Sequence, residues 1–255
     1  MIRTEWAQIP ADVVPSVVGV AILAAITTIV LAVFRVPHVW APLRAIARGA
    51  VQLAVISVIL SGIITSPAWI AAALAVMLCI AASVATGRIG WSRRSALTMF
   101  TSIVTGVLVA GVTVFSAGAL EFTSRYALAI GAIIIGNAMS IATLTGRMFT
   151  SGVVDHWDEV EGWLALGAPP RTSTLHLARR AVREALVPTV DQTRTTGLVV
   201  LPGAFVGAIF GGISPIEAGR FQLVVLAAIL AAGSITAALV VSWMGPVRVK
   251  PAVLK

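Results

Sequence analysis

The sequence is poor in charge, cysteine and histidine. Charged residues make up 11% of its 255 residues, and it has one cysteine and three histidines. The single Cys79 lies in an apolar run, which excludes a disulfide framework and a thiolate metal cluster, and the three histidines are too scattered for a strong metal site. Hydrophobic residues account for 58% of the chain, and the mean hydropathy is +1.00. These values are typical of polytopic membrane proteins.

Two kinds of motif are absent. The sequence has no G-x-x-x-x-G-K-S/T phosphate loop, so the chain lacks this means of binding and splitting ATP. It also has no Ser-His-Asp or Cys-His grouping and no paired carboxylates that would indicate an enzyme. We therefore expect no catalytic residues and no cofactor in this chain, and a separate ATPase if it carries out active transport. The net charge of +8 does not predict nucleic-acid binding, because the charges are spread between apolar segments.

Apolar runs are abundant, and about 20 mainly apolar residues suffice to cross a membrane. The sequence predicts an all-helical, single-domain protein with seven spans. They are residues 14–34, 47–65, 68–86, 96–117, 126–145, 195–213 and 221–243. Fifteen of the 18 Lys and Arg residues fall in alternate connections and at the C-terminus, and cytoplasmic segments carry the excess of such charge. This split predicts an outer N-terminus, a cytoplasmic C-terminus and a multi-pass location in the inner (plasma) membrane.

The fifth connection, residues 146–194, is long enough to fold into structure of its own. Trp157, Val160 and Leu164 are spaced to share one face of a helix. Gly167 then suits a left-handed C-cap, and the prolines at 169–170 end the helix.

A second, arginine-rich helix follows this corner. Its predicted N-cap is Thr172 or Ser173, and it is predicted to stop at Pro188. Its arginines suit anionic lipid headgroups, so the helix pair can be interpreted as lying on the membrane surface. The acidic first helix suits such a surface poorly, and an exposed apolar stripe favours a groove on a soluble partner.

Short motifs then indicate a family. Glu161, followed six positions later by Gly167, resembles the Glu-Ala-Ala…Gly signature of ABC importer permeases, whose loop forms the coupling helix that docks on the ATPase. Most of the chain from the second span onward resembles the ABC permease family typified by the bacterial iron exporter FetB, which includes plant aluminium-tolerance permeases. The resembling segments are RGAVQ at 48–52, IGNAM at 135–139, LGA at 166–168, LVPTVD at 186–191, RTTGLV at 194–199, LPG at 201–203 and GISP at 212–215.

This resemblance implies a permease subunit that works as a homodimer with a separate ABC ATPase, which binds the ATP. It also implies export of a metal ion, with iron expected. Residues 146–194 would be the cytoplasmic coupling insertion. The residues expected to couple to the ATPase are Trp157, Glu161, Trp163, Leu164, Gly167, Ala168 and Pro169.

Polar and helix-breaking residues inside the spans suggest a translocation pathway. Arg48 and Gln52 share a face of the second span, and Asn137 lies near Met139 in the fifth. Pro202 and Gly203 predict a kink in the sixth span. Such residues either line a pathway or form hydrogen bonds and close packing between helices.

A further group precedes the sixth span at its predicted cytoplasmic mouth. It consists of Pro188, Asp191 and Arg194, and the spacing of Asp191 and Arg194 permits an ion pair along a helix. The pair is interpreted either as a cytoplasmic gate or as a helix-capping pair.

Other functions remain open from the sequence. The metal ligands are unknown, so an organic solute such as a nucleotide sugar is an alternative substrate. A channel or carrier that works without an ATPase would need membrane-embedded carboxylates or half-helices that coordinate an ion, and the predicted spans lack such carboxylates. A signal transducer would need a sizeable outer domain, whereas the predicted outer loops are short.

Overall fold

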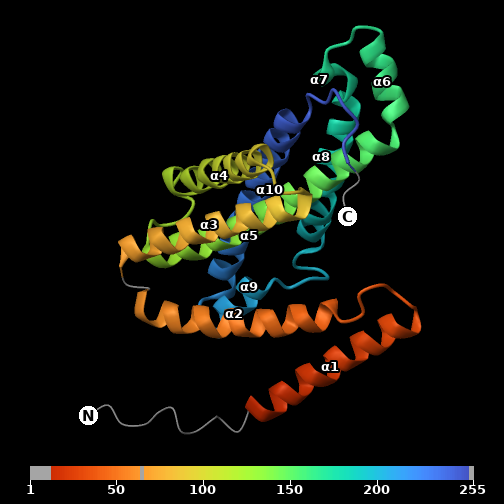
Figure 1. Ribbon diagram of the computed structural model, residues 1–255. Helices are drawn as coiled ribbons and strands as arrows, with labels where there is room; N and C mark the ends of the chain where they lie inside the picture. The colour runs from red at the N-terminus through yellow and green to blue at the C-terminus, as the bar shows by residue number, and fades with distance from the viewer. Residues whose placement is uncertain (1–12, 64–65, 253–255) are drawn as a thin grey trace. The chain divides into compact units, whose positions relative to one another are not determined.

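The computed structural model describes residues 13–63 and 66–252. Within these residues the chain forms ten helices, α1 to α10, and no strand (Figure 1). It divides into two compact units, residues 1–63 and 64–255. The all-helical fold predicted from the sequence is therefore confirmed.

The first unit contains two long apolar helices. They are α1 (Val13–Val33) and α2 (Ala41–Ile63), and the turn between them places Arg35 and His38 in the left-handed backbone region, with φ of 52° and 64°. Because α2 begins before the predicted span, Arg44 and Arg48 lie inside the helix rather than in a connection. Among the described side chains of this unit only Ala24 is buried. Both helices thus present apolar surface on nearly every side.

The second unit is built on four long helices around the main apolar core. They are α3 (Pro67–Ile89), α4 (Arg93–Ser116), α5 (Ser124–Asp155) and α10 (Pro215–Met244). Small residues let these helices approach closely, as is common between membrane helices. Gly106 of α4 lies against Ala232 and Thr236 of α10, and the Thr236 hydroxyl donates to the Ser102 carbonyl at 3.3 Å.

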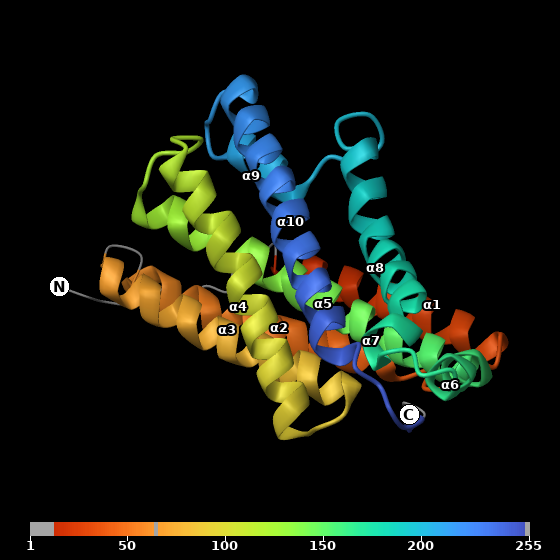
Figure 2. The same cartoon turned by 90° about the horizontal axis from the view of Figure 1, so that it is seen from above.

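Four shorter helices complete this unit. They are α6 (Trp157–Ala165), α7 (Pro170–Ser173), α8 (Leu175–Thr195) and α9 (Gly203–Phe210). Figure 2 shows α4 and α8 on either side of α10, with α6 and α7 near one end of α10 and α9 at the other. The chain therefore passes from one end of the α10 axis to the other through α8 and α9.

Six helices of the described chain are long and apolar enough to cross a membrane, namely α1 to α5 and α10. The predicted span at 195–213 is wrong as a continuous helix. Helix α8 ends at Thr195, residues 196–202 are not helical, and α9 has eight residues. Gly197 takes a left-handed backbone with φ of 86°, and Pro202 precedes α9 as its N-cap. The predicted kink at Pro202 and Gly203 is thus a complete break.

The predicted end of the arginine-rich helix is also wrong, because α8 continues through Pro188 to Thr195. Proline inside a helix removes one backbone hydrogen bond and bends the helix. Buried Leu177, Ala181 and Ala185 hold α8 against its neighbours before the proline. The N-cap position of α8 is Thr174, since α7 takes up the two residues predicted for that role.

Candidate functional site

Helix α6 packs against the rest of the second unit through its apolar face. Val160 is fully buried in a cluster with Phe149, Val153 and Leu177, and both Trp157 and Leu164 pack against this cluster. The predicted stripe of Trp157, Val160 and Leu164 therefore shares a face as expected, but the prediction that it is exposed is wrong. Its function in the structure is to anchor α6 on α5 and α8.

The corner after α6 has the predicted geometry. Gly167 has φ of 86°, a conformation that suits glycine at a helix C-terminus. Its N–H donates to the Leu164 carbonyl at 3.0 Å, and the Ala168 N–H donates to the Trp163 carbonyl at 3.0 Å. Pro169 then begins the next turn by accepting the Thr172 N–H at 2.8 Å. These bonds satisfy carbonyls at the end of α6 and hold the corner rigid.

The two sides of α6 that flank this apolar face are exposed. Glu161 and Trp163 are exposed, Trp163 by 48%, and exposed Leu166 follows them at the corner. Glu159 lies 3.5 Å from His176 Nε2, which links α6 to α8. Residues two apart point to different sides of a helix, so Glu161 and Trp163 lie on either side of the buried apolar face. The structure thus presents one exposed acidic and one exposed aromatic side chain on a helix that packs against α5 and α8, which suits docking on another protein.

Helix α8 runs antiparallel to α10 over most of its length. At one end the Thr174 hydroxyl donates to the Gly245 carbonyl at 2.7 Å. Farther along, Leu186 of α8 and Ile141 of α5 both lie against Gly233. At the other end, Thr193 in the last turn of α8 and Gln222 of α10 line one cavity. The second half of α8 therefore lies beside the apolar middle of α5 and the first half of α10.

This half of α8 carries exposed charges. Arg194 pairs with Asp191 at 3.5 Å, and their side chains are 75% and 60% exposed. The predicted ion pair is confirmed. Helix α8 continues past Pro188 and carries the pair along α10, away from the α6 end of the unit. The role of Pro188, Asp191 and Arg194 as a cytoplasmic gate stays a prediction. Pro188 itself is exposed within the helix.

Between α8 and α9 the backbone makes a compact turn. The Thr195 carbonyl accepts the N–H groups of Leu198, Val199 and Val200, and Gly197 donates to the Val200 carbonyl at 2.9 Å. A cavity of about 340 Å³ lies between this turn, α9 and α10. Pro202 lines this cavity, and Gly203 follows it at the start of α9.

The other predicted pathway residues are dispersed. Arg48 and Gln52 lie exposed on α2, in the first unit. Asn137 donates to the Ile133 carbonyl of its own helix at 2.9 Å rather than to another helix. Met139 packs against the main core.

Sequence reasoning missed Gln222, which is 6% exposed in α10. The signal was present, since a glutamine within a strongly apolar span is costly and merits attention.

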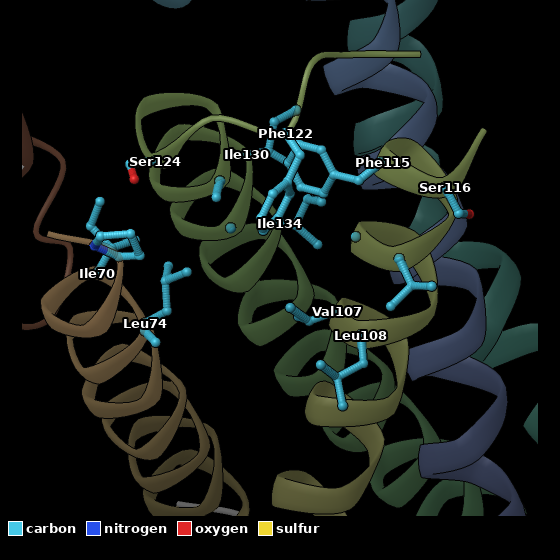
Figure 3. A pocket seen from close by; sticks show the side chains of 16 residues that line it. Ile70, Leu74, Val107, Leu108, Phe115, Ser116, Phe122, Ser124, Ile130 and Ile134 are labelled. Carbon is cyan, nitrogen blue, oxygen red and sulfur yellow. The ribbon is translucent and has the colours of Figure 1, made fainter. Parts of the chain in front are cut away.

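Two larger hollows lie on the second unit. One, of about 610 Å³, separates α3, α4 and α5, and Figure 3 shows the side chains of Ile70 and Leu74 across from Ile130 and Ile134. Its lining is almost wholly apolar, which suits a lipid chain better than a polar solute. The other, of about 740 Å³, lies near α9 and includes the charged residues Arg125, Glu217 and Arg220. Within the described residues, no three His, Cys, Asp or Glu side chains gather as a metal site.

Residues 14–246 match the family model described as Uncharacterised protein family (UPF0014). The chain belongs to this family. The UPF0014 match extends from α1 to just beyond α10, so it includes α6, α8 and the break. Six candidate spans and relatives named as membrane proteins make this UPF0014 chain a multi-pass membrane protein.

Three relatives show the breadth of the family. The chain is 36% identical over 199 residues to "UPF0014 membrane protein STAR2" of Oryza sativa subsp. japonica, covering 77% of this chain and 70% of that protein. It is 33% identical to "Protein ALUMINUM SENSITIVE 3" of Arabidopsis thaliana, covering 75% and 71%. It is 30% identical to "Probable iron export permease protein FetB" of Escherichia coli (strain K12), covering 76% of each. No solved structure matches the chain.

Proposed function

We propose that this chain is the permease subunit of an ABC transporter, in which a separate ATPase drives the export of a metal ion. The observation that carries the transport role is the position of α8 beside the apolar middle of α5 and α10. A charged side chain at the centre of a bilayer costs about 2.5–3.5 kcal/mol or more. Asp191 and Arg194 are largely exposed. Their face of α8 therefore borders water or protein rather than lipid.

In this proposal α8, the break and α9 together form the seventh crossing. Non-helical backbone at membrane depth is tolerated where it is buried in protein or lines a water-filled cavity. Seven crossings agree with the outer N-terminus and cytoplasmic C-terminus predicted from the positive charges. A second copy of the chain would close the pathway along the charged face of α8, which is the reason to propose a homodimer.

The α6 corner supports coupling to an ATPase, which would bind the ATP. Glu161 and Trp163 are exposed on α6, and the apolar face between them belongs to one cluster with Leu177 of α8. A movement of α6 would therefore reach α8 through packed side chains. Trp157 and Leu164 belong to the apolar face that anchors α6, while Gly167, Ala168 and Pro169 form the corner through which force passes.

Iron is the proposed substrate because the similar Escherichia coli protein is named as a probable iron export permease. The membrane orientation proposed above places α6 in the cytoplasm, where the ATPase would be found. An organic solute is the alternative that a transport assay must test.

The coupling role can be tested with the double variant Glu161→Ala, Trp163→Ala. Both side chains are exposed, so the variant should fold and keep its stability. The permease is purified with its cognate ATPase, and both copurification and ATP hydrolysis in liposomes are measured. We expect the ATPase to be lost from the purified permease, and ATP hydrolysis to fall to the level of the ATPase alone. The physical reason is that truncating a tryptophan buried in an interface typically costs about 2 kcal/mol or more of binding free energy.

A matched control is available at the other end of α5. Glu121→Ala, Phe122→Ala also removes one exposed acid and one exposed aromatic side chain. It should leave copurification and hydrolysis unchanged. Equal effects of the two double variants, or no effect of either, would refute docking through α6.

A further inference from the structure

The hairpin of α3 and α4 carries a groove that the proposed transport pathway does not use. Its volume is about 510 Å³, within the range of about 300–1,000 Å³ that is usual for small-molecule sites. Apolar or weakly polar side chains form much of its wall, among them Cys79, Leu97 and Phe100. The hydroxyls of Ser83 and Thr86, which also line it, donate to carbonyls of α3 at 2.8 and 2.7 Å. The wall of the groove therefore suits a hydrocarbon chain.

One end of the groove is polar. Trp91 and Arg93 line it there, at the connection between two helices that are each long and apolar enough to cross a membrane. Trp91 is 70% exposed, and its Nε1 would lie 3.2 Å from a Cβ added at Gly87. The glycine thus leaves room for the indole ring beside α3. An exposed tryptophan at the end of a span is typical of the membrane–water interface.

The positive charge at this end has no acidic counterpart in the hairpin. Residues 66–120 contain three arginines, Arg88, Arg93 and Arg94, and no Asp or Glu. Arg94 donates to the Trp243 carbonyl of α10 at 3.2 Å, whereas the exposed Arg93 has no hydrogen bond or ion pair with any described residue.

Helix stability does not account for Arg93. It is the first residue of α4, where the helix dipole disfavours a cation, while Arg88 lies in the last turn of α3, where the dipole favours one. A guanidinium without a partner is well suited to a phosphate group, which it binds through two parallel hydrogen bonds. Arg93 therefore brings an anion-binding group to the mouth of an apolar groove.

The length of the groove matches one leaflet of a bilayer. Cys79 lies ten residues before the end of α3 at Ile89, which is about 15 Å at a rise of about 1.5 Å per residue. The hydrocarbon core of a bilayer is about 30 Å thick, so one leaflet is about 15 Å. An acyl chain in the groove therefore reaches its deep end when the headgroup is level with Arg93.

We propose that this groove binds an anionic phospholipid from the surrounding bilayer, with one acyl chain between α3 and α4 and the phosphate at Arg93. Basic pockets between membrane helices bind anionic headgroups, and the indole N–H of Trp91 supplies a further donor at the same depth. A zwitterionic lipid offers the same acyl chain without net negative charge, so the groove discriminates by headgroup. The inference goes beyond the proposed transport function and does not depend on the transported substrate.

The test measures lipid binding by the purified full-length chain in detergent. The chain is titrated with phosphatidylglycerol and, separately, with phosphatidylcholine of identical acyl chains, and native mass spectrometry gives the dissociation constant of the first bound lipid. The wild type should bind phosphatidylglycerol more tightly. Arg93→Gln should weaken phosphatidylglycerol binding about fivefold or more, since each basic residue near an anionic headgroup contributes a factor of about five. Its binding of phosphatidylcholine should change little.

Arg88→Gln is the matched control, because it removes the same charge from the same end of the hairpin but outside the groove. It should keep the wild-type affinity for phosphatidylglycerol. Ser83→Phe fills the groove and keeps all three arginines, so it should weaken the binding of both lipids. Ser83→Leu repeats this test if the phenylalanine variant does not fold.

Three results would overturn the site. They are equal losses in Arg93→Gln and Arg88→Gln, equal affinity of the wild type for the two lipids, and unchanged binding when residue 83 is enlarged. A second copy of the chain is the other possible occupant, and Cys79 is the single cysteine of the chain. A dimer joined by a bismaleimide would therefore place a second copy over the groove in place of lipid, whereas we expect no such dimer.

Discussion

Replacing Gly106 with alanine tests how closely α4 and α10 pack. A Cβ at this position would stand 2.6 Å from the Ala232 carbonyl oxygen and would also meet the Thr236 side chain. The carbonyl belongs to helical backbone and cannot rotate away, so the two helices must separate. Gly111 lies on the same helix, and a Cβ there would have no neighbouring atom within 4 Å. Gly111→Ala is therefore a control with the same chemical change.

The two variants differ in packing and share the gain in helix propensity. Alanine is favoured over glycine inside a helix by about 1 kcal/mol, whereas an extra methyl group in a packed interior costs about 1–3 kcal/mol. Gly111→Ala should be neutral or stabilised by up to about 1 kcal/mol. Gly106→Ala should be less stable than Gly111→Ala by about 1–3 kcal/mol, the packing cost alone.

Unfolding by sodium dodecyl sulfate in mixed micelles, followed by circular dichroism, measures this difference. Equal stability of the two variants would refute the packing of α4 on α10 through Gly106. It would also contradict the position of α10, against which α8 and the break pack.

Two further changes test how the functional elements are attached. Val160→Ala removes two methyl groups from a fully buried side chain and should destabilise α6 by about 1–3 kcal/mol. Amide hydrogen exchange should then become faster in α6, with little change in α3. Unchanged exchange in α6 would show that Val160 does not anchor this helix. Thr174→Val removes the 2.7 Å hydrogen bond to the Gly245 carbonyl and should lower the free energy of unfolding by about 1–3 kcal/mol in the same micelle assay. A variant as stable as the wild type would contradict this buried hydrogen bond.

The sequence predicted α6 and its corner well because both depend on local rules. The spacing of Trp157, Val160 and Leu164 sets one helical face, and Gly167 with the following prolines ends the helix within a few residues. Whether that face is exposed is decided by residues far away, such as Phe149 and Leu177. The local pattern therefore predicted which residues share a helical face, but not which distant residues bury that face.

The continuous helix expected at residues 195–213 was mispredicted for a related reason. Residues 195–213 are apolar enough for a span, yet Gly197 and Pro202 interrupt the helix. Conversely, Pro188 is a local signal for the end of α8, yet the helix continues to Thr195. Helix α8 packs against α5 and α10, and this tertiary packing outweighs the local signal of the proline. A register such as that of Leu186 with Gly233 cannot be inferred from spacing along the chain.

The most direct test of the account is ATP-driven metal transport by the reconstituted pair. The chain and its cognate ATPase are placed in liposomes, and Fe²⁺ movement away from the ATPase side is followed with ATP or with a non-hydrolysable analogue. The account predicts Fe²⁺ accumulation in the lumen of vesicles with the ATPase outside, only with hydrolysable ATP, and its loss in the Glu161→Ala, Trp163→Ala variant. Fe²⁺ movement that is equally fast without ATP, or ATP-driven movement of an organic solute but not of Fe²⁺, would contradict it.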